Sequence, residues 1–140
     1  MIRYSWRVYG TPKGQPRPRL GRRGSVYNPP TAKAWKQSIK RLLAAEGYPE
    51  EPLTGPVSVS LLFRMGRPPS HYLKSGRLKK ATKREHLQTP DIDNLSKAVL
   101  DAMTDLGVWV DDCNVIHLEV HKRWSKQIDA GVSIEIRAPH

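Results

Sequence analysis

Several features are scarce in this chain of 140 residues, and each scarcity excludes a class of protein. The single cysteine, Cys113, excludes an internal disulfide framework and is typical of a reducing compartment. No apolar run approaches the roughly 20 residues that a membrane-spanning helix requires, and the first residues lack the apolar core of a signal peptide. We therefore expect a soluble, cytoplasmic protein with no membrane partner.

Two sequence signatures of cofactor use are also absent. The chain contains neither a Walker phosphate-binding loop nor a dinucleotide-binding glycine fingerprint. We therefore expect no ATP or NAD dependence and no small-molecule cofactor.

Acidic residues are absent from the first 45 positions, which carry eleven Lys or Arg side chains. A second basic stretch, residues 64–86, has eight Lys or Arg side chains against one acid, Glu85. The formal net charge is +11, and no amphipathic apolar face accompanies either basic stretch. A polyanionic partner is therefore indicated, with nucleic acid favoured over a membrane surface.

Apolar residues recur with two periods along the chain. A two-residue period predicts four strands that are covered on one face, and a helical period predicts two amphipathic helices, each followed by a glycine (Gly47 and Gly107). In chain order, the expected elements are strand Ile2–Val8, helix 31–46, strand Val57–Arg64, helix 94–106, strand Ile116–His121 and strand Val132–Arg137.

The order β-α-β-α-β-β predicts an α+β fold with two layers. Two helices would cover one face of a four-stranded mixed sheet. The length favours one domain, residues 1–140, with basic loops at about 10–30 and 65–90. Loops of this length tend to be functional or disordered.

Six of the thirteen acidic residues lie between Asp91 and Asp112, inside an otherwise cationic protein. Asp91 and Asp93 precede the second expected helix, where Asp93 takes the N-cap position. If that approach is extended, both carboxylates lie on one side, about 6–7 Å apart along the backbone. Asp111-Asp112 follow the helix, and a return of the chain there could carry one of them back to Asp91.

Such carboxylates repel one another, and a hard cation such as Mg²⁺ removes that repulsion. Mg²⁺ prefers oxygen ligands and keeps several waters, which suits activation of a water beside a phosphate. Lys97 lies in one polar stripe with Asp93 and Asp101 and could stabilise developing charge. Each group also has an ordinary interpretation: Asp93 as a helix cap, Asp111-Asp112 as a turn, Lys97 as a solvated residue. From chemistry alone, both interpretations stay open.

The acidic region carries a family resemblance. The run Asp91-Ile-Asp-Asn-Leu-Ser-Lys97 closely resembles the RusA family of Holliday junction resolvases. The resemblance covers almost the whole chain and is most specific between Asp91 and Val115. The other segments that carry it are Ala98, Asp101-Ala102, Gly107–Asp112 and, as in phage-type members, Gly10–Arg19 and Tyr27-Asn-Pro.

The resemblance implies a Mg²⁺-dependent homodimer, with Mn²⁺ able to substitute, that nicks four-way or branched DNA symmetrically and leaves 5′-phosphate and 3′-hydroxyl ends. It implies a role in DNA recombination and repair in a bacterial cell, with a phage or prophage origin included. Its essential residues match Asp91, Asp93 and Asp112 as metal ligands and Lys97 as the fourth catalytic group. Asp101 and Asp111 are spare ligands, which leaves one or two metal ions open.

Two rival functions are compatible with the same features. One is a non-catalytic nucleic-acid-binding protein on the same fold, and the other is a less selective nuclease of branched DNA. The basic loops likewise either line a path for DNA or only add solubilising charge. The candidate DNA-binding residues are Lys13, Arg17, Arg19, Arg22, Arg23, Lys79, Lys80, Lys83 and Arg84.

The remaining polar and aromatic residues predict less. His117 and His121 would stand about 13 Å apart on a strand, which is too far to share a zinc ion with Cys113. Tyr27, Tyr72 and Trp124 could stack on an opened base, although Trp124 fits a core position equally well.

Overall fold

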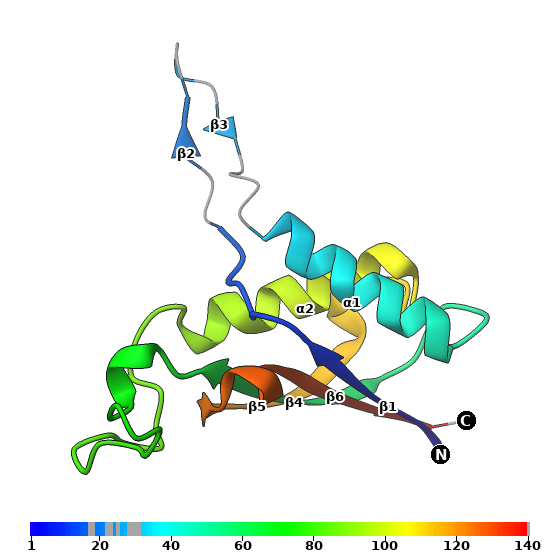
Figure 1. Ribbon diagram of the computed structural model, residues 1–140. Helices are drawn as coiled ribbons and strands as arrows, with labels where there is room; N and C mark the ends of the chain where they lie inside the picture. Colours follow the sequence, from blue (N-terminus) through cyan, green and yellow to red (C-terminus); the bar gives the residue numbers. More distant parts are fainter. Residues whose placement is uncertain (17–18, 22–23, 25, 28–31, 140) are drawn as a thin grey trace.

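A four-stranded sheet with two helices on one face forms the body of the protein (Figure 1). The structure, a computed structural model, describes residues 1–16, 19–21, 24, 26–27 and 32–139. The elements are β1 (Ile2–Tyr9), β2 (Arg19–Leu20), β3 (Val26–Tyr27), α1 (Lys33–Glu46), β4 (Val57–Gly66), α2 (Ile92–Leu106), β5 (Val115–Ser125) and β6 (Gly131–Ala138). Short 3₁₀ turns cover Pro69–His71, Asp112–Asn114 and Gln127–Asp129.

The sheet has the order β1-β6-β4-β5. β4 and β5 are parallel and are connected through α2, whereas β6 pairs antiparallel with both β1 and β4. The expected mixed sheet and its α+β class are therefore confirmed.

Burial alternates strictly along β4, the central strand that contacts both neighbours. Val57, Val59, Leu61, Phe63 and Met65 are buried on the side of α1 and α2, and the intervening residues are half-buried on the other side. Apolar residues of both helices pack on that buried face, so one core joins the two layers.

The expectation of a covered apolar face fails at the start of β5. Ile116 is 72% exposed and Leu118 is 42% exposed, and only Val120 of the predicted trio is half-buried. β5 is an edge strand, and its pairing with β4 shifts register between Val57 and Ser58. Periodicity alone does not reveal that one strand of the sheet lies at its margin.

The first basic loop contains a short ladder in which β2 pairs antiparallel with β3 (Figure 1). The second basic loop is folded around Arg67, which is buried. Its Nη2 donates to the carbonyl of Lys83 at 2.9 Å and its Nη1 to Nδ1 of His71 at 3.3 Å. His71 and His86 in turn contact the edge of Trp124 at centroid distances of 4.8 and 4.5 Å. The basic loop is thus anchored to β5 next to α2.

No helix in the described ranges combines the length and the apolar character that crossing a membrane requires.

Phe63 lies at the centre of the core, with an exposed fraction of 0%. Phe63→Ala should lower the free energy of unfolding by about 3–5 kcal/mol, because the deletion removes buried apolar surface and leaves a cavity. Urea titration followed by circular dichroism measures this change. The control is Ile128→Ala, at a side chain that is 81% exposed, which should change the free energy by no more than about 0.5 kcal/mol. Equal losses in both variants would contradict the assigned core.

Candidate active site

The amino-terminal end of α2 holds the first two predicted carboxylates. The helix begins at Ile92, so Asp91 occupies the N-cap and Asp93 lies in the first turn. The side-chain amide of Asn94 donates to Oδ1 of Asp91 at 2.7 Å, and the amide of Leu95 donates to the Asp91 carbonyl at 3.1 Å. The prediction of Asp93 as N-cap is therefore wrong: the approach to the helix is extended at Asp91, but the helix starts there, two residues earlier than expected.

Lys122 of β5 holds the segment that leads into Asp91. Its Nζ donates to the carbonyls of Gln88 at 2.8 Å and of Pro90 at 3.0 Å. Burial lowers the pKa of Lys122, and the negative charge of Asp91 partly opposes that shift. No role was expected for Lys122 from the sequence. The sequence does place Lys122 on the side of the helices, because it continues the alternation of Leu118 and Val120, and a lysine on that side needs a polar partner.

Residues Thr11–Pro16 cross the same end of α2. The amide of Gln15 donates to the Asn94 carbonyl at 2.9 Å. A Cβ on Gly14 would lie 3.1 Å from the Cβ atoms of Asn94 and Pro90, so the segment packs closely there. Residues Thr11–Pro16 border an open hollow of about 710 Å³, and Asp91 and the predicted DNA-binding residue Lys13 lie on its wall. Oε1 of Gln15 is buried and has no hydrogen-bond partner among the described residues.

Along α2, the predicted polar stripe is partly engaged by α1. Asp101 Oδ2 lies 3.6 Å from Lys36 Nζ, and Asp105 Oδ2 lies 3.0 Å from Lys40 Nζ. Asp101 therefore has a structural partner, in contrast to the exposed Lys97 one turn before it, for which the described part of the chain shows no ion pair.

The Asp111-Asp112 pair separates into two roles. Asp111 caps the 3₁₀ turn: its Oδ1 accepts from the amide of Asp112 at 2.7 Å, and its own amide donates to Asn114 Oδ1 at 3.1 Å. The Asp112 carboxyl is exposed. Desolvation first, then hydrogen bonding to Asp111 and the charges of Asp111 and Asp101, raise the pKa of Asp112, whereas the charge of Lys97 lowers it.

The carboxylates thus lie around α2 in two groups. Asp112 is influenced by Lys97 and Asp101, whereas Asp91 acts on Lys122. Within the described ranges, no three His, Cys, Asp or Glu side chains are grouped closely enough to hold an ion. The donor chemistry suits Mg²⁺, since Asp91, Asp93 and Asp112 are exposed carboxylates and a bound cation would favour the ionised form of Asp112, whose pKa desolvation and the acidic neighbours Asp111 and Asp101 raise.

Four predicted DNA-binding residues, Lys79, Lys80, Lys83 and Arg84, are exposed on the second basic loop. Arg17, Arg22 and Arg23 lie outside the described residues, and Arg19 falls in β2, where only the backbone is described.

The three side chains that were rejected above as a zinc site are surface residues. Cys113 is exposed, as are His117 and His121, and His121 Nε2 lies 3.3 Å from Glu119 Oε1. Of the candidate stacking residues, Trp124 and Tyr72 are half-buried, and Trp124 packs against the core.

The raised pKa of Asp112 has a consequence for stability. A carboxyl whose pKa is higher in the folded than in the unfolded state destabilises the fold above that pKa. The penalty disappears as the pH falls below the ordinary value of about 3.9. Asp112→Asn should therefore raise the urea midpoint at pH 7 in EDTA, and the gain should shrink towards pH 4.

The matched control is Asp105→Asn, which makes the same charge change on α2 but removes the ion pair with Lys40. It should leave the midpoint unchanged or lower it slightly, since an exposed pair contributes about 0–1 kcal/mol. A lower urea midpoint for Asp112→Asn than for this control would contradict the destabilisation assigned to the ionised Asp112 carboxyl.

This chain is similar to known proteins over the whole of this site. The sequence model of the family described as Endodeoxyribonuclease RusA matches residues 9–137. Uncharacterized protein YqaN of Bacillus subtilis (strain 168) is 35% identical over 127 residues, which cover 86% of this chain and 87% of YqaN. The family match takes in α2 and the turn at Asp111-Asp112. It confirms the resemblance found in the sequence: the chain belongs to the RusA endodeoxyribonuclease family.

Proposed function

We propose that this protein is a Mg²⁺-dependent, structure-selective endodeoxyribonuclease that resolves Holliday junctions by paired symmetric nicks during DNA recombination and repair. The observation that carries the proposal is the exposed carboxyl of Asp112, on which the charge of Lys97 acts, on the flank of the helix whose N-cap is Asp91 and whose first turn carries Asp93. A metal-dependent nuclease needs carboxylates that hold the metal ion and a nearby positive side chain, whereas a protein that only binds DNA needs no such carboxylates.

Asp91, Asp93 and Asp112 would hold Mg²⁺, with Mn²⁺ able to substitute. The bound ion would supply a Lewis acid and a water of lowered pKa at the scissile phosphate. Asn94 orients the Asp91 carboxylate, and Lys122 holds the backbone before it. Lys97 would stabilise the negative charge that develops on the phosphate during attack.

The cationic surface would hold the DNA backbone. Lys13 lies in the hollow beside Asp91, and Lys79, Lys80, Lys83 and Arg84 are exposed on the loop that leads into it. We extend this role to Arg17, Arg19, Arg22 and Arg23 of the first basic loop. Contacts of this kind position the duplex without reading its sequence.

Paired cuts at symmetric points of a junction require two active sites, and a twofold homodimer supplies them. The protein would act in the bacterial cytoplasm, whether the gene belongs to the host or to a phage. The test is a synthetic four-way junction incubated with Mg²⁺ or EDTA, beside a flap, a fork and a linear duplex. Paired nicks on the junction alone support the proposal, and cutting of all branched substrates favours the less selective nuclease. No cutting of any substrate favours a non-catalytic DNA-binding protein.

Asp91→Asn, Asp93→Asn and Asp112→Asn should each abolish junction cutting while affinity for the junction stays equal or rises, because each removes negative charge near DNA phosphates. Denaturing gels in Mg²⁺ measure cutting, and mobility shifts in EDTA measure binding. Asp105→Asn is the control on the same helix and should cut normally. Retained cutting in any two of the three variants would disprove the trio.

Lys97→Ala should lower the cutting rate by roughly 10²–10³-fold with little change in affinity, as expected for a preorganised charge that acts in the transition state. Single-turnover rates on saturating junction separate this from a loss of binding. Lys33→Ala, at an exposed lysine of α1, is the control and should retain the rate. A variant that lost only affinity would make Lys97 a phosphate contact instead.

A further inference from the structure

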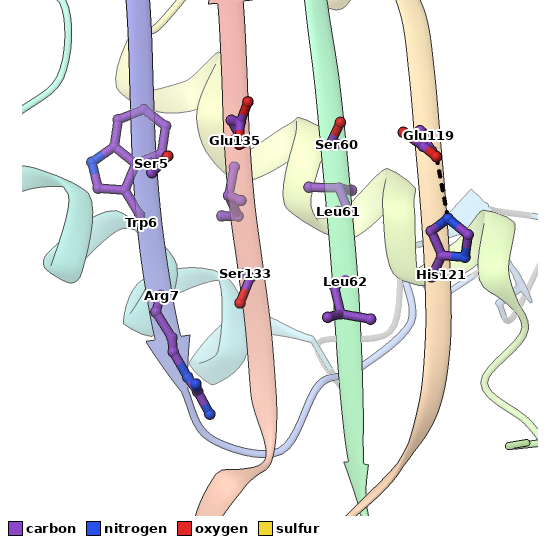
Figure 2. Close-up of a pocket in the computed structure, with 11 residues that line it drawn as sticks. Ser5, Trp6, Arg7, Ser60, Leu61, Leu62, Glu119, His121, Ser133 and Glu135 are labelled. Atoms are coloured by element: carbon purple, nitrogen blue, oxygen red, sulfur yellow. Dashed lines mark hydrogen bonds and ion pairs between the residues drawn. The ribbon is translucent and has the colours of Figure 1, made fainter. Parts of the chain in front are cut away.

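The face of the sheet opposite the helices carries ordered rows of side chains (Figure 2). The pairing of the strands sets one row as Arg7–Ser133–Leu62–His121. The next row is Tyr9–Gly131–Arg64–Arg123. Three arginines from three different strands thus gather near the carboxyl end of β4.

Two acids on this face, Glu135 and Glu119, are paired with other side chains. Glu135 Oε1 lies 3.9 Å from Arg3 Nε and 3.5 Å from Arg137 Nε. Glu119 lies against His121, at 3.3 Å. Within the described part of the chain, no carboxylate forms an ion pair with Arg7, Arg64 or Arg123.

Instead, neutral groups hold two of these arginines, Arg64 and Arg7, in place. Arg64 Nη1 donates to Ser133 Oγ at 2.8 Å, and the Arg7 guanidinium lies 4.7 Å from the centre of the Tyr9 ring. Burial lowers the pKa of Arg64, and the positive charges of Arg7 and Arg123 lower it further. The charge of Asp129 partly offsets this effect on Arg64, but none of the three guanidinium groups forms an ion pair in the described part of the chain.

This cluster continues around the edge of the sheet. A hollow of about 440 Å³, lined by the three cations Arg84, Lys122 and Arg123 and by one acid, Glu85, adjoins the larger one of about 520 Å³ with Arg7 on its wall. Both hollows include Leu62 and His121. Lys122 points to the side of Asp91, and its neighbour Arg123 lies on the open face, because successive residues of a strand alternate.

We infer that Arg7, Arg64, Arg84 and Arg123, here called the arginine track, bind the phosphodiester backbone of a DNA arm that leaves the catalytic side around the edge of β5. The inference rests on the proposed function. Arginine forks match phosphate oxygens in a bidentate way. From β1 to β5 the track crosses three strand spacings, about 14 Å, which is the rise of about four nucleotides along one DNA strand. A polymer of phosphates fits this length, whereas a single small anion does not.

The test neutralises the two arginines of the track that lie on the outer strands of the sheet, Arg7 of β1 and Arg123 of β5. Arg7→Gln/Arg123→Gln should lower the slope of log affinity against log salt by up to about 1.8 for a four-way junction, since each lost phosphate contact contributes about 0.9. The control, Arg3→Gln/Arg137→Gln, removes the same charge from the same face, but from arginines that are paired with Glu135. It should leave the slope unchanged. Arg7→Lys/Arg123→Lys should restore most of the slope, because it keeps the charge.

Binding is measured in EDTA with a junction and with a linear duplex of equal total length. The slope should fall less on the duplex, which has no second arm to reach the open face. Equal falls on both DNAs would overturn the assignment to an arm, and equal falls in the track and control variants would overturn the track. A changed sedimentation coefficient of the DNA-free variant would make this face a contact between protein copies and also overturn it.

These readouts do not depend on cutting. If the wild-type protein cut no branched DNA in Mg²⁺ and the arginine pair still lowered the slope, the proposed activity would fail and the track would stand. Junction cutting together with an unchanged slope would leave the activity and remove the track.

Discussion

The apolar contact between α2 and the sheet determines where the candidate catalytic groups lie. Leu95, Ala98, Val99, Ala102 and Met103 are all completely buried against the core. With that stripe turned inward, the opposite stripe of the helix must face solvent. The chain then returns along the same helix to the turn before β5, so the charges of Lys97 and Asp101 act on Asp112 although they lie 15 and 11 residues before it in sequence.

The acids of this region differ in whether they have a structural partner. Asp101 and Asp105 are partnered by Lys36 and Lys40 of α1, and Asp111 caps a turn. Asp112 stays exposed with a raised pKa, because desolvation, hydrogen bonding to Asp111 and the negative charges of Asp111 and Asp101 disfavour its ionised form. Stability and the proposed catalysis therefore make opposite demands on this carboxyl, as is common at functional sites.

The second basic loop, which leads into Asp91, is held in place by two buried or half-buried cations. Arg67 holds the basic loop through Lys83 and His71, and Lys122 holds its last residues. Both cations bind backbone carbonyls, so they shape the loop instead of contacting a polyanion. A basic composition thus includes residues with structural roles, and the count of Lys and Arg side chains overstates the surface that is free for DNA.

The amino-acid sequence by itself determined the layers of the fold, the family and the two basic stretches, because amphipathic period and local motif are encoded within short windows. It also placed Asp91, Asp93, Lys97 and Asp112 as candidates. Only the tertiary structure decided the rest. The helix starts at Ile92 and not at 94, with Asn94 bonded to Asp91, and the first half of the edge strand β5 proved to be exposed. The cluster of Arg7, Arg64 and Arg123 depends on the pairing order of strands far apart in the chain, which no local pattern encodes.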